Sequence, residues 1–330
     1  MRRVAITGIS GYIGSRLCQR LDALPQVERI VGIDLREPRL PTAKVALYLR
    51  DINRPLESIF TENGIDTAIH LAFVLRPTHD QTGTRRTNVG GGASFLDACR
   101  AAGVKHILYL SSTSAYGAHP DNPIPLTEES PLRPNKRFQY SRDKAETDSL
   151  FWRFAAEHRE TKVTILRGCV VMGPGGAGSI GSAMFQPIMV RVAGHNPPVQ
   201  YVHEDDLLDL MIHVIENGIE GVFNVAGNGT FPYSDLAAMA RRPMVAVPSF
   251  LLKPLMDLAW GLRLQSGSSS PGLDFIKYPW VVSTEKLTRE AGFNFRFSSR
   301  DAIMAYVEAK RNKGKLVEKG QTESDTAVRS

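Results

Sequence analysis

Short apolar segments alternate with amphipathic ones through the first half of the chain, and this alternation constrains the fold more than any other feature. Near-continuous apolar runs of strand length lie at residues 3–7, 29–34, 45–49, 66–72 and 105–111. Between the first two runs, Leu17, Leu21 and Leu24 recur at helical spacing. Strands of a covered parallel sheet read as continuous apolar runs, and helices make the crossovers between them. The pattern therefore predicts an α/β fold with a doubly wound parallel sheet.

The second half of the chain is less regular. A glycine-rich loop at residues 173–181 precedes a mixed region, which has a strand-like run at 223–226 and is rich in proline, tryptophan and leucine from Pro243 onward. We interpret these pieces as a smaller C-terminal cap over the open edge of the sheet. The expected domains are the sheet domain at 1–172, the cap at 173–309 with some segments returning to the sheet, and a disordered polar tail at 310–330.

Composition places the chain among ordinary globular proteins, with 330 residues and a net charge of +6. Three scattered cysteines without a CxxC pair favour reduced thiols and a cytoplasmic location. Because an apolar strand begins at Arg3, we expect no signal peptide, and no later run is long enough to span a membrane. Part of the positive charge lies in the tail, where no aromatic residue is interleaved with the lysines. We expect a solvated terminus there and no nucleic-acid partner.

A glycine loop, TGISGYIG, joins the first strand to the first helix. Gly8, Gly11 and Gly14 would permit a tight turn, a close approach of the backbone to a pyrophosphate, and close packing of helix on strand. The helix N-terminus that follows would offer free N–H groups to the phosphates. The spacing is GxxGxxG, which departs from the general GxGxxG dinucleotide pattern. These features predict a Rossmann-like domain that binds a dinucleotide.

Asp34 ends the second strand, twenty residues after Gly14. A carboxylate at this place accepts hydrogen bonds from the adenosine ribose, and it repels a 2′-phosphate. It therefore favours NAD over NADP, although Arg36 could compensate for a phosphate. Asp51 follows the next strand and could accept from the adenine amino group; the alternative is that it caps the following segment.

A literal GxGxxG match also occurs at residues 176–181, after the apolar run 164–171. No acidic residue closes a second strand about twenty residues later, as a dinucleotide site would require. We interpret this match as a mobile loop over the active site.

The segment YSRDK places the phenol of Tyr140 and the ammonium of Lys144 four residues apart. On a helix, both side chains project from one face. A free tyrosine has a pKa near about 10, and a neighbouring ammonium lowers it by stabilising the phenolate. Ser112 belongs to the run SSTSAYG directly after the fifth strand, and ligands bind at such strand ends. The three side chains together predict proton transfer to or from a hydroxyl-bearing carbon.

Taken together, TGISGYIG, Asp34, the His70-Leu71-Ala72 segment, SSTSAYG, YSRDK and LRGCVVMGP resemble the extended short-chain dehydrogenase/reductase family, in its NAD-dependent epimerase/dehydratase branch. The resemblance covers about residues 3–175 and, more loosely, the segment that starts at Tyr201. It implies an NAD enzyme that oxidises, reduces or epimerises a secondary alcohol or ketone in a small-molecule substrate.

By this resemblance, Ser112 holds the substrate oxygen, Tyr140 is the acid/base, and Lys144 binds the nicotinamide ribose and tunes Tyr140. The residues implied at the cofactor are Gly8, Gly11, Tyr12, Ile13, Gly14, Asp34, Leu35, Arg36, Asp51, Ile52, Leu71, Ala72, Phe73, Asn88, Ser111, Tyr140, Lys144 and Arg167. Family members often have alanine where this chain has Phe73. We expect that difference to alter packing near the adenosine rather than the chemistry.

Two further groups of polar residues are open to a functional and a structural interpretation. His70 could act as a base, but the last residue of a buried strand is more often a hydrogen-bonded core residue. The run His203 to Asp206 could suggest a metal site. Acids before the apolar segment LLDLMIHVI fit a helix cap and a first turn matched to the helix dipole better, so we expect no metal.

The sequence of the cap does not determine the identity of the substrate. Sugar-nucleotide members of the family usually carry an arginine just before the acidic turn, whereas the stretch 194–201 has none, and Arg191 lies slightly upstream. The run at 250–264 could form an apolar pocket wall or touch a membrane; we expect it to pack on the cap's own core. A dehydratase is less favoured, because SSTSAYG lacks the Asp-Glu pair of sugar dehydratases.

Two alternatives accompany the predicted oxidoreductase or epimerase. One is a nucleotide-sugar epimerase. The other is a non-catalytic NAD(P) sensor, which usually loses the tyrosine or the lysine, whereas both are present here. Relatives often dimerise through a bundle that contains the YxxxK helix. The apolar stretch 145–157 allows a homodimer, and it could equally pack within one chain.

Overall fold

A seven-stranded, wholly parallel sheet forms the centre of the computed structural model, which describes residues 1–38, 43–75, 78–176, 181, 183–264 and 270–312. The strand order is β11-β6-β5-β4-β1-β2-β3, and each neighbouring pair is parallel. The strands span β1 Arg2–Thr7, β2 Val27–Asp34, β3 Val45–Leu49, β4 Thr67–His70, β5 His106–Ser112, β6 Lys162–Gly168 and β11 Gly221–Val225. The expected α/β, doubly wound class is confirmed.

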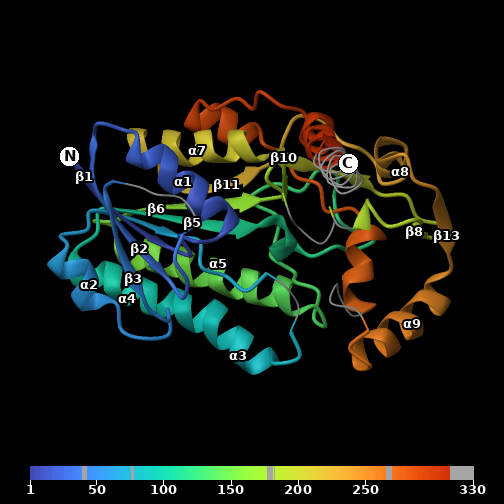
Figure 1. Cartoon of the computed structure of the whole chain (residues 1–330), viewed down its shortest axis with the longest axis horizontal. Helices are drawn as coiled ribbons and strands as arrows, with labels where there is room; N and C mark the ends of the chain where they lie inside the picture. The colour runs from blue at the N-terminus through green and yellow to red at the C-terminus, as the bar shows by residue number, and fades with distance from the viewer. Residues whose placement is uncertain (39–42, 76–77, 177–180, 182, 265–269, 313–330) are drawn as a thin grey trace, which may run out of the picture.

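Helices cover both faces of this sheet (Figure 1). One face carries α1 (Tyr12–Asp22) and α7 (Glu204–Asn217), whose leucines are buried against β1 and β6. The other face carries α2 (Glu57–Glu62), α4 (Gly91–Ala102) and α5 (Gln139–Glu157). Phe60, Phe95 and Phe151 from these three helices are fully buried there. Burial on both faces explains the apolar runs within these strands, such as residues 4–6 in β1 and 107–108 in β5.

The strand order reverses at β1. The chain proceeds from β1 outward through β2 and β3, then returns to the opposite side of β1 with β4, β5 and β6. Loops that leave β1 and β4 therefore diverge to opposite faces, and a crevice opens between them at the carboxyl ends of the strands. The loops after Thr7, His70 and Ser112 all lie at this edge.

The second half of the chain builds a separate hydrophobic cluster and three two-stranded sheets. Met172, Met184, Tyr201, Phe231 and Tyr306 belong to the buried cluster. Its strands are β7 Val170–Met172, β8 Met189–Val192, β9 Pro198–Val199, β10 Tyr201–His203, β12 Phe231–Pro232 and β13 Met244–Val247. The remaining elements described there are α8 Asp235–Ala240, α9 Ser249–Gly261, η3 Ser270–Ile276 and η4 Leu287–Ala291. Shorter elements in the first half are α3 Gln81–Arg85, η1 Arg86–Gly90 and η2 Thr113–Tyr116.

Parts of the second half return to the sheet, since β11 pairs with β6 and α7 lies beside α1. A helix over residues 299–312 crosses the expected boundary at residue 309, because Ala302, Ile303, Tyr306 and Val307 are buried in the cap cluster. The expected tail beyond it, at residues 313–330, lies outside the described residues, as does most of the 176–181 loop.

The prediction that the 250–264 segment packs on the cap core is wrong for most of its length. In α9 only Leu252 is buried, in a small cluster with Val192 and Leu273. Leucines 251, 255, 258 and 262 and Phe250 are more than half exposed. These leucines recur at three- and four-residue spacing and so form a second apolar face of the helix, which the described residues leave largely exposed. No helix among the described residues is long and apolar enough to cross a membrane.

Candidate active site

The glycine loop after β1 is closed by contacts that leave no room for side chains. Gly8 has φ +72°, and a Cβ on it would lie 2.7 Å from the Ala72 backbone nitrogen. A Cβ on Gly14 would lie 2.3 Å from the Gly8 carbonyl oxygen. The Gly11 N–H donates to that same oxygen at 3.0 Å. The loop therefore packs tightly between the start of α1 and the end of β4, as the glycine spacing predicted.

The N-terminus of α1 presents unused donors beside this loop. Gly11 is the N-cap, and no side chain caps the helix. The N–H groups of Tyr12, Ile13 and Gly14 have no acceptor within the helix, because the first turn of an α-helix leaves its donors free. Such a turn, with its positive dipole end, fits the pyrophosphate of a dinucleotide.

Asp34 ends β2 next to the same loop. Its carboxylate accepts hydrogen bonds from the backbone N–H groups of Ser10 at 3.0 Å, Leu35 at 2.7 Å and Arg36 at 3.3 Å. The Ser10 hydroxyl in turn donates to the Arg36 carbonyl. Asp34 thus holds both the glycine loop and the chain after β2, in the place where a ribose would lie against an NAD-binding carboxylate.

Tyr140 is the second residue of α5, and Lys144 follows one turn later on the same helix. The spacing therefore produces the expected common face. Burial raises the pKa of Tyr140, and the nearby hydroxyls of Ser112 and Ser114 lower it. The Ser112 hydroxyl oxygen accepts from the Ser114 N–H at 3.1 Å and caps η2 directly after β5. The structure thus brings Ser112, Tyr140 and Lys144 together at the strand ends.

Lys144 is 4% exposed, and its ammonium donates to the Leu110 carbonyl at 2.8 Å. Removal from water lowers the pKa of Lys144 to about 7, and the carboxylate of Asp148 opposes this. An ammonium with one bond of its three still has donors for a ligand hydroxyl.

Phe73 lies against the predicted catalytic pair. Its ring centre is 3.8 Å from the Lys144 nitrogen, and its ring meets the Tyr140 ring edge-on at 5.7 Å between centres. We expected Phe73 to affect the adenosine region only. That expectation is wrong, because the Phe73 ring lies against the two side chains of α5 that carry the predicted chemistry.

Asn88 fixes the position of this chain segment. Its side-chain oxygen accepts from the Val74 N–H at 2.7 Å, and its amide donates to Asp143 at 2.9 Å. Asp143 lies on α5 between Tyr140 and Lys144 and is buried. Asn88 was predicted behind the cofactor; its partner Asp143 was missed, although its place inside YSRDK was a signal that could have found it.

Ser111 and Arg167, both expected at the cofactor, use their side chains elsewhere. The Ser111 hydroxyl donates to Asp148 at 2.6 Å, and Arg167 forms two bonds to the same carboxylate at 2.8 and 3.0 Å. Arg167 also donates to the Tyr116 hydroxyl at 2.9 Å. This buried network ties β5, β6 and α5 together, and sequence reasoning missed Asp148 at its centre.

The remaining predicted cofactor residues are placed as follows. Leu71 and Ala72 follow β4, where their N–H groups donate to the Thr7 carbonyl and hydroxyl. Asp51 accepts from the backbone and side-chain nitrogens of Asn53, both at 2.9 Å, and so closes a turn; it caps no helix, since α2 begins at Glu57 with Leu56 as its N-cap. Ile52 is buried against Gly91, and the buried Tyr12 hydroxyl has no hydrogen-bond partner in the part of the chain that the structure describes.

His70 is a core residue in this structure. Its Nδ1 lies 2.9 Å from the Thr7 hydroxyl, and its ring packs among Phe95, Tyr109 and Phe151. Burial lowers its pKa to about 3, with a smaller contribution from the Lys144 charge. The structural interpretation of His70 therefore holds.

The acidic turn before α7 is a helix start. His203 is the N-cap and accepts from the Asp205 N–H at 3.1 Å. Glu204 and Asp205 form ion pairs with Arg16. Asp206 pairs with Arg296 at 3.2 Å. The capping interpretation is confirmed, and within the described ranges no cluster of three His, Cys, Asp or Glu side chains could hold a metal ion.

Comparison with known proteins identifies the family to which this architecture belongs. Residues 4–226 match the family described as the NAD dependent epimerase/dehydratase family. The chain belongs to this family. The expected relationship to extended short-chain dehydrogenases is thereby confirmed, and the glycine loop, Asp34 and the YxxxK helix all lie within the matched residues.

Individual relatives of this family member are distant in sequence. An uncharacterised protein of Mycobacterium tuberculosis is 24% identical over 93% of this chain and 84% of its own length. UDP-glucose 4-epimerase of Azospirillum brasilense is 27% identical over 63% of this chain and 66% of its length. The solved structure of MoeE5 in complex with UDP-glucuronic acid and NAD superposes with a TM-score of 0.73 at 21% identity, covering 94% of this chain and 99% of MoeE5.

Proposed function

We propose that this chain is an NAD-dependent oxidoreductase or epimerase that acts on a secondary alcohol or ketone, with Tyr140 as its acid/base. The observation that carries the proposal is the convergence of Ser112, Tyr140 and Lys144 at the carboxyl end of β5. This convergence lies at the sheet edge where the Gly8 loop follows β1. A hydride acceptor held by that loop would lie beside an acid/base side chain, which is the pairing that alcohol oxidation needs.

The residues have distinct proposed roles. NAD, when bound, supplies a hydride acceptor. Gly8, Gly11 and the free N–H groups of α1 would hold its pyrophosphate, and Asp34 would hold the adenosine ribose. Ser112 would orient the substrate oxygen. Tyr140 would take the proton from that oxygen in oxidation and return it in reduction, while the Lys144 ammonium would stabilise the phenolate and bind the nicotinamide ribose.

The principal alternative within this chemistry is a nucleotide-sugar epimerase. The similarity to a UDP-glucose 4-epimerase and to MoeE5, which was solved with a UDP-sugar acid, supports it. The absence of an arginine from residues 194–201 argues against a standard nucleotide contact. A non-catalytic NAD(P) sensor is the second alternative, and the retention of both Tyr140 and Lys144 argues against that.

The organisation proposed from the sequence accompanies this function. Residues 1–172 would form the NAD-binding domain with the catalytic side chains, and 173–309 would mostly bind substrate. A homodimer through α5 is supported by Trp152, which is 58% exposed, whereas Phe151 and Phe154 pack within the chain. A cytoplasmic location is in keeping with the sparse, scattered cysteines, all three of which are buried.

Replacing Tyr140 tests the catalytic proposal. Wild-type protein and the Tyr140→Phe variant would be screened for NAD reduction against a panel of secondary alcohols and UDP-sugars, with NAD binding followed by protein fluorescence. Removing the acid/base should lower turnover by about 10²–10⁴-fold and leave NAD binding intact. Tyr48→Phe, in β3, is the matched control and should behave like wild type. Equal turnover by Tyr140→Phe would overturn the assignment.

A further inference from the structure

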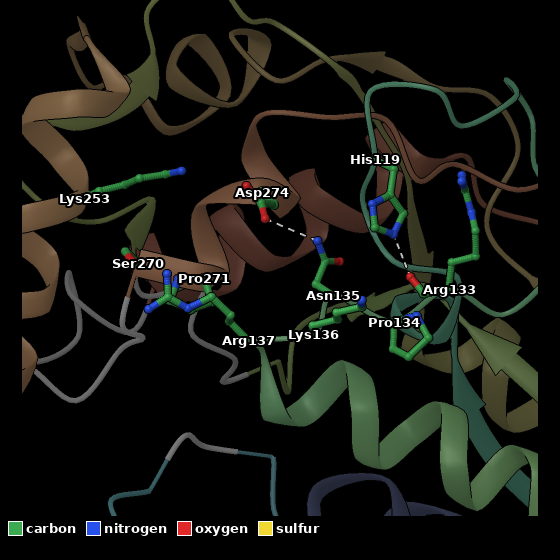
Figure 2. A pocket seen from close by; sticks show the side chains of 10 residues that line it. All are labelled: His119, Arg133, Pro134, Asn135, Lys136, Arg137, Lys253, Ser270, Pro271 and Asp274. Atoms are coloured by element: carbon green, nitrogen blue, oxygen red, sulfur yellow. Dashed lines mark hydrogen bonds between the residues drawn. The ribbon is translucent and has the colours of Figure 1, made fainter.

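A pocket of about 670 Å³ lies where the segment before α5 meets the cap (Figure 2). One wall is the chain at 133–137, and the opposite wall comes from α9 and the start of η3. The residues that line it are His119, Arg133, Pro134, Asn135, Lys136, Arg137, Lys253, Ser270, Pro271 and Asp274. The two walls are therefore contributed by the sheet domain and by the cap.

Part of the polar lining is used to build the pocket. Arg133 pairs with Asp121 at 2.8 Å, and His119 Nε2 lies 2.6 Å from the Arg133 carbonyl oxygen. Asn135 donates to the Asp274 carboxylate at 3.2 Å, which joins the two walls. These contacts account for the charge of Arg133 and give Asp274 its hydrogen-bond donor.

Three cations of the lining are left without a counter-ion. Lys136 and Arg137 come from the segment before α5, and Lys253 comes from α9 (Figure 2). No salt bridge or hydrogen bond to their side chains exists among the described residues, and all three are exposed. Among the described residues that line the pocket, Asp274 supplies the one carboxylate that faces these cations. Like charges gathered from two separate elements repel each other, and a bound anion would relieve this repulsion.

The pocket wall at 133–137 leads into the start of α5, where Tyr140 lies. Arg137 precedes Tyr140 by three residues, and the Phe138 ring between them lies 6.1 Å from the Tyr140 ring and 5.2 Å from Phe275 of the cap. The Asn135 N–H donates to the Ser141 hydroxyl at 3.1 Å, which anchors the pocket wall to the start of α5. A molecule seated in the pocket could thus extend toward Tyr140.

We propose that this pocket binds an anionic group, a phosphate or carboxylate, of the substrate whose alcohol or ketone carbon reacts at Tyr140. This inference rests on the proposed function and adds the substrate class to it. Arg137 offers a planar fork that matches both anions, and the two lysines add point charges from either wall. Because Lys253 belongs to α9, anion binding also connects the cap to the sheet domain.

Anion binding to the NAD-saturated full-length protein tests this inference without requiring turnover. Saturating NAD keeps the probe from the glycine loop. Inorganic pyrophosphate and malonate would be titrated separately by calorimetry, so that a phosphate-type and a carboxylate-type preference are distinguished. The variants are Lys136→Gln/Arg137→Gln on one wall and Lys253→Gln on the other. The matched control is Lys105→Gln/Arg159→Gln, which removes two exposed charges near the opposite ends of β5 and α5.

We expect wild type to bind at least one probe. The Lys136/Arg137 double variant should raise its Kd by about tenfold or more, since each charge-assisted hydrogen bond contributes at that scale. Lys253→Gln should raise it too, and the control should not. Absence of binding of either anion, or binding that both pocket variants leave unchanged, would overturn the inference. Neither outcome affects the catalytic assignment, because that assignment is tested separately by the turnover of Tyr140→Phe. The Tyr140→Phe variant itself should bind the anion like wild type.

Discussion

The Lys144 ammonium nitrogen lies 3.8 Å from the centre of the Phe73 ring, at a place where burial lowers the pKa of Lys144 to about 7. The ring acts on the ammonium in two opposite ways. It excludes water, which disfavours the charged form, and its π face attracts the cation, which favours it. The attraction amounts to about 0.5–2 kcal/mol. Removal from water is the largest cause of the lowered pKa of Lys144, and we expect it to outweigh the attraction of the ring.

Removing the Phe73 ring should therefore raise the pKa of Lys144. In Phe73→Ala, water reaches the ammonium, and we expect the pKa to move back toward its ordinary value. Phe73→Leu is the control, because it keeps an apolar side chain and removes only the π face. An NMR titration of the lysine side-chain carbons, with Lys144→Met for assignment, measures both. A Phe73→Ala pKa at or below that of wild type would contradict the dominance of desolvation.

The glycine loop offers a graded series. Alanine at Gly8 or Gly14 places a Cβ 2.7 or 2.3 Å from backbone atoms, whereas at Gly11 the closest approach is 3.1 Å. Gly8→Ala and Gly14→Ala should lower the free energy of unfolding by roughly 1–3 kcal/mol, as strained backbone substitutions do. Gly11→Ala should lower the free energy of unfolding by less and should still weaken NAD binding. Thermal unfolding and NAD titration give the two rankings, and equal stability of all three variants would speak against the packed loop.

Cofactor choice should depend on Asp34. In Asp34→Ala the carboxylate that would hold the ribose is removed, and Arg36 is left to attract a 2′-phosphate. The Kd for NAD should rise by about tenfold, which corresponds to one charge-assisted hydrogen bond, and the Kd for NADP should fall. Asp51→Ala is the comparison, since the Asp51 carboxylate accepts hydrogen bonds from Asn53 in this structure. Fluorescence titration with each dinucleotide measures these Kd values. A wild-type preference for NADP would contradict the proposed role of Asp34.

His70 should make the protein sensitive to acid. Its pKa is about 3 in the folded chain, against an ordinary value of 6.5, so the unfolded chain binds the proton more readily. Stability is then full above pH 6.5 and falls as the pH drops toward 3. By this linkage the loss at pH 5 is about 2 kcal/mol.

A variant without the imidazole should lack this component. His70→Phe keeps a ring among Phe95, Tyr109 and Phe151, and its free energy of unfolding should change less between pH 7 and pH 5 than that of wild type. His158→Gln, near the protein surface, is the control and should retain the wild-type dependence. Urea unfolding at the two pH values measures the difference, and parallel losses in wild type and His70→Phe would refute the role of His70.

The strands, the glycine loop and the YxxxK helix were predictable because their signals are local. Continuous apolar runs identify β1, β2 and β5, since a strand buried on both faces admits almost nothing else. Gly8 and Gly14 are required by contacts within one turn and its neighbour, and Tyr140 and Lys144 share a face through helical periodicity alone. For the same reason the acidic run after His203 could be interpreted as a helix start.

The tertiary structure alone decided which distant residues meet. The Phe73 ring contacts Lys144, Asn88 donates to Asp143, and Arg167 pairs with Asp148, although the partners lie on different elements of the chain. The basic pocket likewise unites Arg137 with Lys253. The sequence by itself determined the sheet, the cofactor loop and the spacing of the catalytic pair, because hydrophobic periodicity and backbone sterics act over a few residues. Which side chains surround that pair depends on how the chain leaves β4 and how the cap folds back, and no local pattern encodes those paths.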